Sequence, residues 1–253
     1  MNLIKKILFK LLSERTYVKV LHRTFYLMYD LGLLKKNKSF KYHYFIKKII
    51  KPDFVVVDIG ANLGYFAKSF ARLTPQGKVI CIEPVPLFNQ TLTYFLKKFK
   101  HVEIHPIGLG NEDSQLTMAL PKSNGIIRTG LPHILKKNET IEQDTECIDV
   151  EIKNSNSFFD RISKIDYIKC DIEGYEKTVF ECIESTLELH RPIVQIEIAR
   201  DNMNYFLDLF KKLNYSQYGI VKFSLKQESG NQEEEGDFLF IPEEKKHLVD
   251  KLK

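Results

Sequence analysis

The sequence predicts an α/β fold built on a mostly parallel β-sheet with helices on both faces. After Pro52, short runs rich in β-branched residues alternate with helical patterns, which is the order that βαβ units produce. The 253 residues, 43% of them hydrophobic, are enough for the core of one domain and an additional segment. Charge divides the chain similarly: residues 1–51 hold thirteen Lys and Arg against Glu14 and Asp30, a net charge of +11, so the remainder carries −6 of the overall +5.

The first 51 residues are predicted to form a basic helical extension. Apolar residues recur at helical spacing from Leu3 to about Asp30, and a second helical segment covers about Lys41 to Ile50. We expect the apolar face of this extension to pack on the rest of the chain. Peripheral contact of its basic face with an anionic membrane is the alternative. No stretch approaches the roughly 18 consecutive apolar residues of a transmembrane segment.

Five strands are predicted between Pro52 and Ala199. Each is a short apolar run bounded by turn residues or charges, and a helical pattern separates most of them. The predicted strands are residues 53–58, 77–83, 101–107, 166–171 and 191–199. The predicted helices are residues 62–73, 85–99, 174–189 and 201–213.

The long connection between the third and fourth strands has a different character. Residues 114–160 contain two extended runs, QLTMAL and CIDVEIK, whereas residues 122–144 are polar and unpatterned, which is typical of a lid or a long loop. Two further strands, residues 215–223 and 237–242, end the chain. We expect them to form an antiparallel pair at the edge of the sheet.

A glycine-containing turn follows the first strand and indicates a ligand site. The segment VVVDIGANLGYF ends a buried strand at Asp58 and continues through Gly60, Asn62 and Gly64 into a helix. Glycines let a ligand approach the backbone without meeting a Cβ, and the free amides at a helix start can donate hydrogen bonds. The sequence therefore predicts that a nucleotide-like ligand binds at Gly60, Asn62 and Gly64.

Two cofactors compete for this turn. A dinucleotide-binding turn reads G-x-G-x-x-G and faces pyrophosphate, whereas this one begins at Asp58, whose carboxylate would repel pyrophosphate. S-adenosylmethionine has no phosphate, and Asp58 can bind its α-ammonium group directly or through water. Glu83 ends the second strand, where a carboxylate can accept both ribose hydroxyls. The alternative is that Asp58 and Glu83 only cap the helices that follow them.

Five segments, in this order and spacing, carry a resemblance to a known family: VVDIGANLGYFA (56–67), VICIEPVP (79–86), IGLGNEDSQLTM (107–118), IDYIKCDIEGYEKTVF (165–180) and DFLFIP (237–242). They resemble the FkbM-type S-adenosylmethionine-dependent methyltransferases, whose Lys-x-Asp-x-Glu-Gly signature looks like IKCDIEG here. The resemblance covers about residues 52–242 and implies a Rossmann-like class I methyltransferase fold, so we assign residues 52–253 to a methyltransferase domain. It also implies a seven-stranded sheet of order 3-2-1-4-5-7-6 with strand seven antiparallel. Family members are mostly assigned to O-methylation of sugar or secondary-metabolite hydroxyls.

The fourth-strand segment supplies the predicted catalytic residues. Asp171 falls at the carboxyl end of a strand next to the first, beside the point where ligands bind in open α/β sheets. An alcohol is a poor nucleophile while it holds its proton, so Asp171 is the candidate base, with Lys169 as a charge partner or substrate orienter and Glu173 beside them. The alternative is that Asp171 and Glu173 only stabilise the N-terminus of the next helix.

Three further roles are weighed on position alone. Glu197 and Asp201 could join Asp171 around Mg²⁺, but sequence spacing alone does not show that they lie within coordination distance, so no metal is predicted. His133 in the long connection is a second candidate base, although a lone loop histidine is usually solvated. Asn111, assigned to the end of the third strand, is the candidate for hydrogen bonds to adenine, although many family members look to have an acid there.

The function predicted is S-adenosylmethionine-dependent O-methylation of a small hydroxylated molecule, such as a glycan or lipid-linked sugar. RNA ribose methylation is the first alternative, but the chain beyond residue 51 is net acidic where a duplex needs a positive track. A non-catalytic membrane-associated binding module is the second. The cysteines Cys81, Cys147, Cys170 and Cys182 form no C-x-x-C pair, and we expect reduced, buried packing residues in a cytoplasmic protein.

Overall fold

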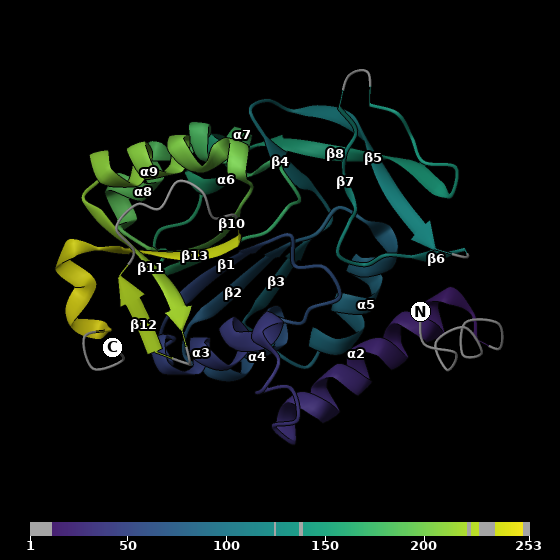
Figure 1. Ribbon diagram of the computed structural model, residues 1–253, viewed down its shortest axis with the longest axis horizontal. Helices are drawn as coiled ribbons and strands as arrows, with labels where there is room; N and C mark the ends of the chain where they lie inside the picture. The colour runs from purple at the N-terminus through teal and green to yellow at the C-terminus, as the bar shows by residue number, and fades with distance from the viewer. Residues whose placement is uncertain (1–11, 124, 137–138, 222–223, 228–235, 250–253) are drawn as a thin grey trace.

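The protein is built around one large sheet with helices on both faces (Figure 1). The computed structural model describes residues 12–123, 125–136, 139–221, 224–227 and 236–249. In these residues the main sheet has eight strands in the order β12-β11-β13-β10-β9-β1-β2-β3. Five neighbouring strands of this sheet, β10, β9, β1, β2 and β3, pair in parallel. β13 runs antiparallel to both of its neighbours.

The central strands lie where the sequence places them, with ends that differ by one to two residues in most cases. They are β1 (Val55–Ile59), β2 (Lys78–Ile82), β3 (Val102–His105), β9 (Tyr167–Cys170) and β10 (Ile193–Ile198). β1 pairs with β2 on one side and β9 on the other, with Asp58 opposite both Cys81 and Lys169. The carboxyl ends of β1, β2, β9 and β10 therefore meet at one edge of the sheet.

The C-terminal strands correct the expected strand count. β11 (Tyr215–Val221) and β13 (Gly236–Pro242) form the expected antiparallel pair, and β13 lies between β10 and β11. An additional strand, β12 (Ser224–Gln227), pairs with β11 at the edge, so the sheet has eight strands rather than seven. The other seven follow the order 3-2-1-4-5-7-6, because β13 bonds to β10 and displaces β11 outward.

Helices cover the sheet in two layers, which Figure 1 shows above and below it. One layer contains α3 (Lys41–Ile49), α4 (Ala67–Leu73) and α5 (Pro86–Leu96), and the other contains α6 (Ser155–Phe159), α7 (Glu176–Cys182), α8 (Glu184–His190) and α9 (Met203–Lys212). Alternating residues of β1 enter the two cores, Val57 facing the α7–α9 layer and Val56 the α3–α5 layer. Short 3-10 helices cover Lys38–Phe40, Arg200–Asn202 and Glu243–Leu248.

Two predicted helices differ from the structure for local backbone reasons. α4 begins at Ala67 rather than residue 62, because Asn62 (φ 52°) and Gly64 (φ 88°) adopt the left-handed conformation and cannot continue a helix. The helix predicted over 174–189 starts at Glu176 and divides into α7 and α8 at Ile183, whose ψ of 21° departs from helical geometry.

The long connection forms a second sheet rather than a lid without structure. Its strands are β4 (Gly108–Gly110), β5 (Ser114–Ser123), β6 (Ile126–Ile127), β7 (His133–Ile134) and β8 (Thr145–Asn154). β5 and β8 contain the two predicted extended runs, and they pair antiparallel over eight residues each, from Ser114 opposite Ile152 to Pro121 opposite Thr145. The segment that looked unpatterned contributes β6 and β7, which both pair with β5.

The N-terminal helix packs on the domain as expected. α2 (Glu14–Asp30) buries Tyr17 and Val18 against the second sheet and α5, and Phe25, Tyr26 and Tyr29 against α3 and the start of α4. The Tyr26 hydroxyl donates to the carbonyl of Tyr65 at 2.7 Å. The first two turns of the predicted helix, residues 3–11, lie outside the described residues.

Two further observations bear on the expectations from composition. All four cysteines are free; Cys81 and Cys170 are buried as expected, whereas Cys182 is half-buried and Cys147 on β8 is exposed, because β8 turns that side toward solvent. Among the described residues, no helix combines the length and the apolar character that crossing a membrane requires.

Candidate active site

A cavity lies at the carboxyl edge of the main sheet, between this edge and the second sheet. Its floor and one wall come from the residues that follow β1, β2, β9 and β10, and its opposite wall comes from β4, β5, β7 and β8. The lining includes Gly60, Asn62, Glu83, Asp171, Glu173 and Glu197, which the sequence analysis had singled out. The cavity thus joins residues from segments more than a hundred positions apart.

Glu83 is held at the end of β2 by backbone hydrogen bonds. Its Oε2 accepts from the amide of Asn62 at 2.7 Å, and its Oε1 accepts from the amide of Val85 at 2.8 Å. Burial raises the pKa of Glu83 to about 7, and these two amides only partly offset that effect. Each carboxylate oxygen keeps a further lone pair, so Glu83 can accept two hydrogen bonds from a ligand in the cavity.

The turn after β1 is fixed to its neighbours. The amides of Gly60 and Ala61 both donate to the carbonyl of Ile82 at 3.0 Å, and the Asn62 side chain donates to the carbonyl of Thr129 in the loop that covers the cavity. Gly60 has φ 76°, and a Cβ there would lie 2.0 Å from the carbonyl oxygen of Asp171. Gly60 is therefore required by the close approach of β9 as well as by any ligand.

Gly64 does not line the cavity, in contrast to the prediction from its position in the turn. Its φ is 88°, and a Cβ there would lie 2.8 Å from Cδ1 of Leu92 on α5. The residue allows the turn to reverse and α5 to pack closely against it. The sequence could not separate a glycine that admits a ligand from one that admits a neighbouring helix.

Asp58 lies beneath the cavity rather than in its wall. Its side chain is fully buried, and neither carboxylate oxygen has a hydrogen-bond partner among the described residues. The nearest cation is the Lys169 ammonium, 3.7 Å from Oδ1. Burial raises the pKa of Asp58 to about 6, and Lys169 counteracts part of that rise. Asp58 is not part of the cavity lining, and its contact with the α-ammonium group, directly or through water, stays a prediction.

Lys169 is a buried cation between two carboxylates. Its Nζ lies 3.1 Å from Oδ2 of Asp171 and 3.7 Å from Oδ1 of Asp58, and it donates to the carbonyl of Gly60 at 3.3 Å. Burial alone would lower the pKa of Lys169, but Asp171 and Asp58 outweigh burial and raise it above its usual value. Lys169 therefore stays charged and does not line the cavity, so it acts on Asp171 rather than on a ligand.

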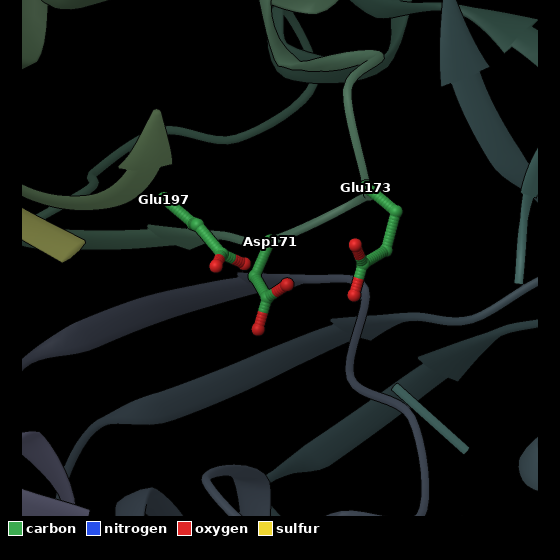
Figure 2. Close-up of side chains that lie close together, drawn as sticks. All are labelled: Asp171, Glu173 and Glu197. Atoms are coloured by element: carbon green, nitrogen blue, oxygen red, sulfur yellow. The ribbon is translucent and has the colours of Figure 1, made fainter. Parts of the chain in front are cut away.

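Three carboxylates converge where β9 and β10 end (Figure 2). Asp171 lies between Glu197 and Glu173, and one oxygen from each falls within 4.8 Å of the others. Burial raises the pKa of Asp171, but the Lys169 ammonium and a hydrogen bond with Glu197 reverse this and hold it below its usual value. Burial and the charge of Asp171 raise the pKa of Glu197 to about 8.

Glu173 completes this cluster in a strained position. It has φ 52° and precedes Gly174 at φ 92°, which delays the start of α7 to Glu176. Burial, followed by the charge of Asp171, raises its pKa to about 7. As the pH rises, Asp171 thus ionises first among the three carboxyls, and Glu173 and Glu197 keep their protons to higher pH.

The acids that lie close enough together to share a divalent cation differ from those considered from the sequence. Asp201 lies in the 3-10 helix after β10 and is not part of the cluster, and Glu173 takes its place beside Asp171 and Glu197. Three oxygen ligands at this spacing would suit Mg²⁺. The same convergence is stabilised by the shared proton and by Lys169, so it does not by itself indicate a metal.

Two other predicted residues lie away from the cavity. Asn111 follows β4 of the second sheet rather than the third strand, is exposed, and its carbonyl accepts from the Asn154 side chain; it is absent from the lining. The ring of His133 on β7 contacts the carbonyl of Leu131 through Nδ1, and its Nε2 lies 2.7 Å from Oε1 of Glu139. His133 lines a second, neighbouring hollow, which has Glu173 in common with the cavity. Neither residue lines the cavity, and the roles of Asn111 at adenine and of His133 as a base stay predictions.

Sequence reasoning missed the apolar wall of the cavity. Leu109, Met118, Ile134 and Ile152 of the second sheet face the cavity, opposite Val85 and Phe88 of the main domain, and Tyr175 closes one side. Alternation of apolar residues in QLTMAL and CIDVEIK was the available signal for Met118 and Ile152.

A model of the family "Methyltransferase FkbM domain" matches residues 58–219. Methyltransferase 1 of Beauveria bassiana (strain ARSEF 2860) is 26% identical over 150 residues, 52% of this chain and 59% of that protein. The 2-O-methyltransferase NoeI of Sinorhizobium fredii (strain NBRC 101917 / NGR234) is 41% identical over 56 residues, 22% of this chain and 23% of that protein. The crystal structure of methyltransferase FkbM from Methylobacillus flagellatus KT is 16% identical, with a TM-score of 0.49, and the match covers 75% of this chain and 44% of that one.

The mostly parallel sheet has helices on both faces, and acidic residues at the carboxyl ends of its strands line one cavity. Together with the family match, these features define a methyltransferase domain of the α/β class. These matches span less than two thirds of each curated relative. Since the family model covers well over half of the residues, the chain belongs to the FkbM methyltransferase family.

Proposed function

We propose that the protein is an S-adenosylmethionine-dependent O-methyltransferase that acts on a hydroxyl of a small molecule, a glycan or a lipid-linked sugar. The observation that carries the proposal is a single cavity whose lining includes Glu83 and Gly60 together with the Asp171 cluster. The first pair suits a nucleoside, and the cluster suits a hydroxyl that must lose its proton.

The residues present fit S-adenosylmethionine. Glu83 would accept the two ribose hydroxyls with its remaining lone pairs, and Gly60 leaves the backbone open to the ligand. Asp58, with both oxygens lacking hydrogen bonds beneath the turn, supplies a negative potential for the α-ammonium group. Asn111 remains a prediction for adenine, and Val85, Phe88 and Leu109 in the cavity lining would offer apolar contacts to a flat ring. When bound, the cofactor supplies an electrophilic methyl group.

The Asp171 cluster prepares the acceptor. Asp171 is one-third exposed and ionised, so it can accept a hydrogen bond and then the proton from a hydroxyl in the cavity. Lys169 orients the carboxylate from below, and protonated Glu197 donates to it from the side. Glu173 is the second base in reach, since its pKa of about 7 leaves it partly ionised at neutral pH.

Two observations favour an oxygen acceptor of small size. The relative NoeI is named a 2-O-methyltransferase, although it matches only 56 residues of this chain. The ionised Asp171 and the partly ionised Glu173 both line the cavity, and their negative charge would repel the phosphates of an RNA backbone. A neutral polyol such as a sugar meets no such repulsion.

Calorimetric titration of the purified protein with S-adenosylmethionine and with NAD tests the cofactor. We expect binding of the first only; binding of NAD, or of neither compound, would overturn the proposal. A panel of sugars and glycolipids is then assayed for formation of S-adenosylhomocysteine, with the Glu83→Ala variant as control. Methylation of RNA in preference to every hydroxylated small molecule would refute the acceptor class.

A further inference from the structure

An exposed apolar patch lies at the C-terminal end of α2. Its members are Leu27, Met28, Leu31 and Leu33, and we call them the α2-end patch. Their relative exposures are 62%, 36%, 65% and 64%. Only seven large hydrophobic residues of the described chain are this exposed, and four of them fall within these seven positions. Such clustering marks a surface that binds something apolar.

The patch is a fixed feature of the fold. The opposite face of α2 is held on the domain by Phe25, Tyr26 and Tyr29, so the helix cannot rotate to bury Leu27 and Leu31. Beyond the helix end, the amide of Leu33 donates to the carbonyl of Met28 at 2.9 Å, which brings Leu33 back beside the last turn. Both faces of this part of α2 are therefore apolar, and one of them has no cover among the described residues.

Positive charge lies next to the patch on its C-terminal side. Lys35, Lys36 and Lys38 follow it directly and are exposed, and among the described residues no carboxylate forms an ion pair with them. The nearest acid in the sequence, Asp30, is already paired with Arg72 at 3.0 Å. The local surface therefore combines projecting leucines with unneutralised cations.

We propose that the α2-end patch docks the protein on the surface of an anionic lipid bilayer. Leucines at the end of an amphipathic helix can enter the boundary between head groups and acyl chains, while lysines beside them attract anionic head groups. A second copy of the chain fits less well, because a symmetric contact would bring the same lysines together, and four side chains offer far less than the roughly 800 Å² per partner of a stable dimer.

Co-sedimentation with vesicles tests this docking. The full chain is mixed with vesicles of phosphatidylcholine alone or with about one third phosphatidylglycerol, and the bound fraction is measured over lipid concentration. The variant Leu27→Ser/Leu31→Ser/Leu33→Ser should lose at least about tenfold in partitioning onto the anionic vesicles. Replacing Lys35, Lys36 and Lys38 by Ala should cost about fivefold per lysine at low salt. Leu189→Ser is the matched control, since Leu189 on α8 is 76% exposed but lies outside the patch.

The outcomes are distinguishable from those of methyl transfer. Circular dichroism and S-adenosylmethionine binding of the triple variant report on folding and on the cavity independently of lipid. Unchanged vesicle binding by the triple variant would overturn the proposal, as would equal binding to neutral vesicles or an equal loss in Leu189→Ser. Sedimentation equilibrium showing a dimer that the triple variant dissociates would assign the patch to a second copy instead, and so would also overturn it.

Discussion

Replacing Asp171 with Asn tests which group takes the acceptor's proton. Asn has nearly the same shape as Asp. In the variant, the Lys169 ammonium still has the carbonyl of Gly60 at 3.3 Å and the Asp58 carboxylate at 3.7 Å as partners, so the protein should still fold. Glu83 follows β2 and Asp171 follows β9, with β1 between these two strands, so we expect S-adenosylmethionine affinity to stay within about fivefold of wild type, which is about 1 kcal/mol. Methyl transfer should fall by about 10² to 10⁴, the usual contribution of a general base.

The assay measures acceptor-dependent formation of S-adenosylhomocysteine across pH, with Asp201→Asn as the matched control. Asp171 has a pKa below its usual value, so a rate that depends on it should not fall between pH 8 and 5. A rate that depends on Glu173 should instead drop as pH falls through about 7. Above about pH 8, Glu197 loses the proton that it donates to Asp171, and the rate should decline. Wild-type turnover by Asp171→Asn, with an inactive Glu173→Gln, would show that the base is Glu173.

Three further predictions concern the cavity and its support. Glu83→Ala should weaken S-adenosylmethionine binding about tenfold to a hundredfold by calorimetry, because charge-assisted hydrogen bonds are lost; unchanged affinity in a folded variant would contradict the ribose assignment. Gly60→Val should lower the melting temperature as well as cofactor affinity, since its Cβ would meet Asp171 backbone at 2.0 Å; a normal melting temperature would disprove this contact. His43→Phe should raise stability at pH 5 but not at pH 8, by about 2 kcal/mol. Burial lowers the His43 pKa to about 3, so stability is lost as pH falls below the unfolded value of 6.5, and equal unfolding shifts at both pH values would argue against it.

The sequence could predict the parallel core and the position of the site, because both follow from local patterns. A buried run such as VVVD is hydrophobic on both faces, and this marks an inner strand of a covered parallel sheet. Once the strands are known, parallel pairing places Asp58, Glu83, Asp171 and Glu197 at the same edge. No knowledge of side-chain contacts is needed for that step.

The second sheet could not be predicted in the same way. β5 and β8 are separated by more than twenty residues, and the pairing that aligns Ser114 with Ile152 is set by contacts that the intervening polar segment does not encode. The apolar wall of the cavity depends on this pairing, so Leu109 and Ile152 escaped notice. Asn111 was misplaced for the same reason, because β4 belongs to the second sheet and not to the main one.

The sequence pattern also cannot show whether an acidic side chain reaches the cavity or is buried beneath it. Asp58 and Glu83 both end or nearly end a strand, yet Glu83 reaches the cavity and Asp58 lies under it, facing Lys169 on the neighbouring strand. The register between β1 and β9 makes this difference, since it aligns Asp58 directly with Lys169. Sequence spacing gave each residue a position along the chain but not its partner across the sheet.

Lys169 explains why the cluster can hold one ionised acid among three. A buried ammonium is costly unless carboxylates compensate it, and Asp58 and Asp171 together provide that compensation. Because Asp171 is the nearer, at 3.1 Å, and is exposed on its far side, it stays ionised, whereas Glu197 and Glu173, which lack a cation as close, retain protons to higher pH. The order of ionisation thus follows from burial and the charge of Asp171, which raise the pKa of Glu197 and Glu173, and from Lys169, which offsets burial at Asp171. This order makes Asp171 the group that is always ready to accept a hydrogen bond, and makes Glu173 the group whose protonation can change during a reaction near neutral pH.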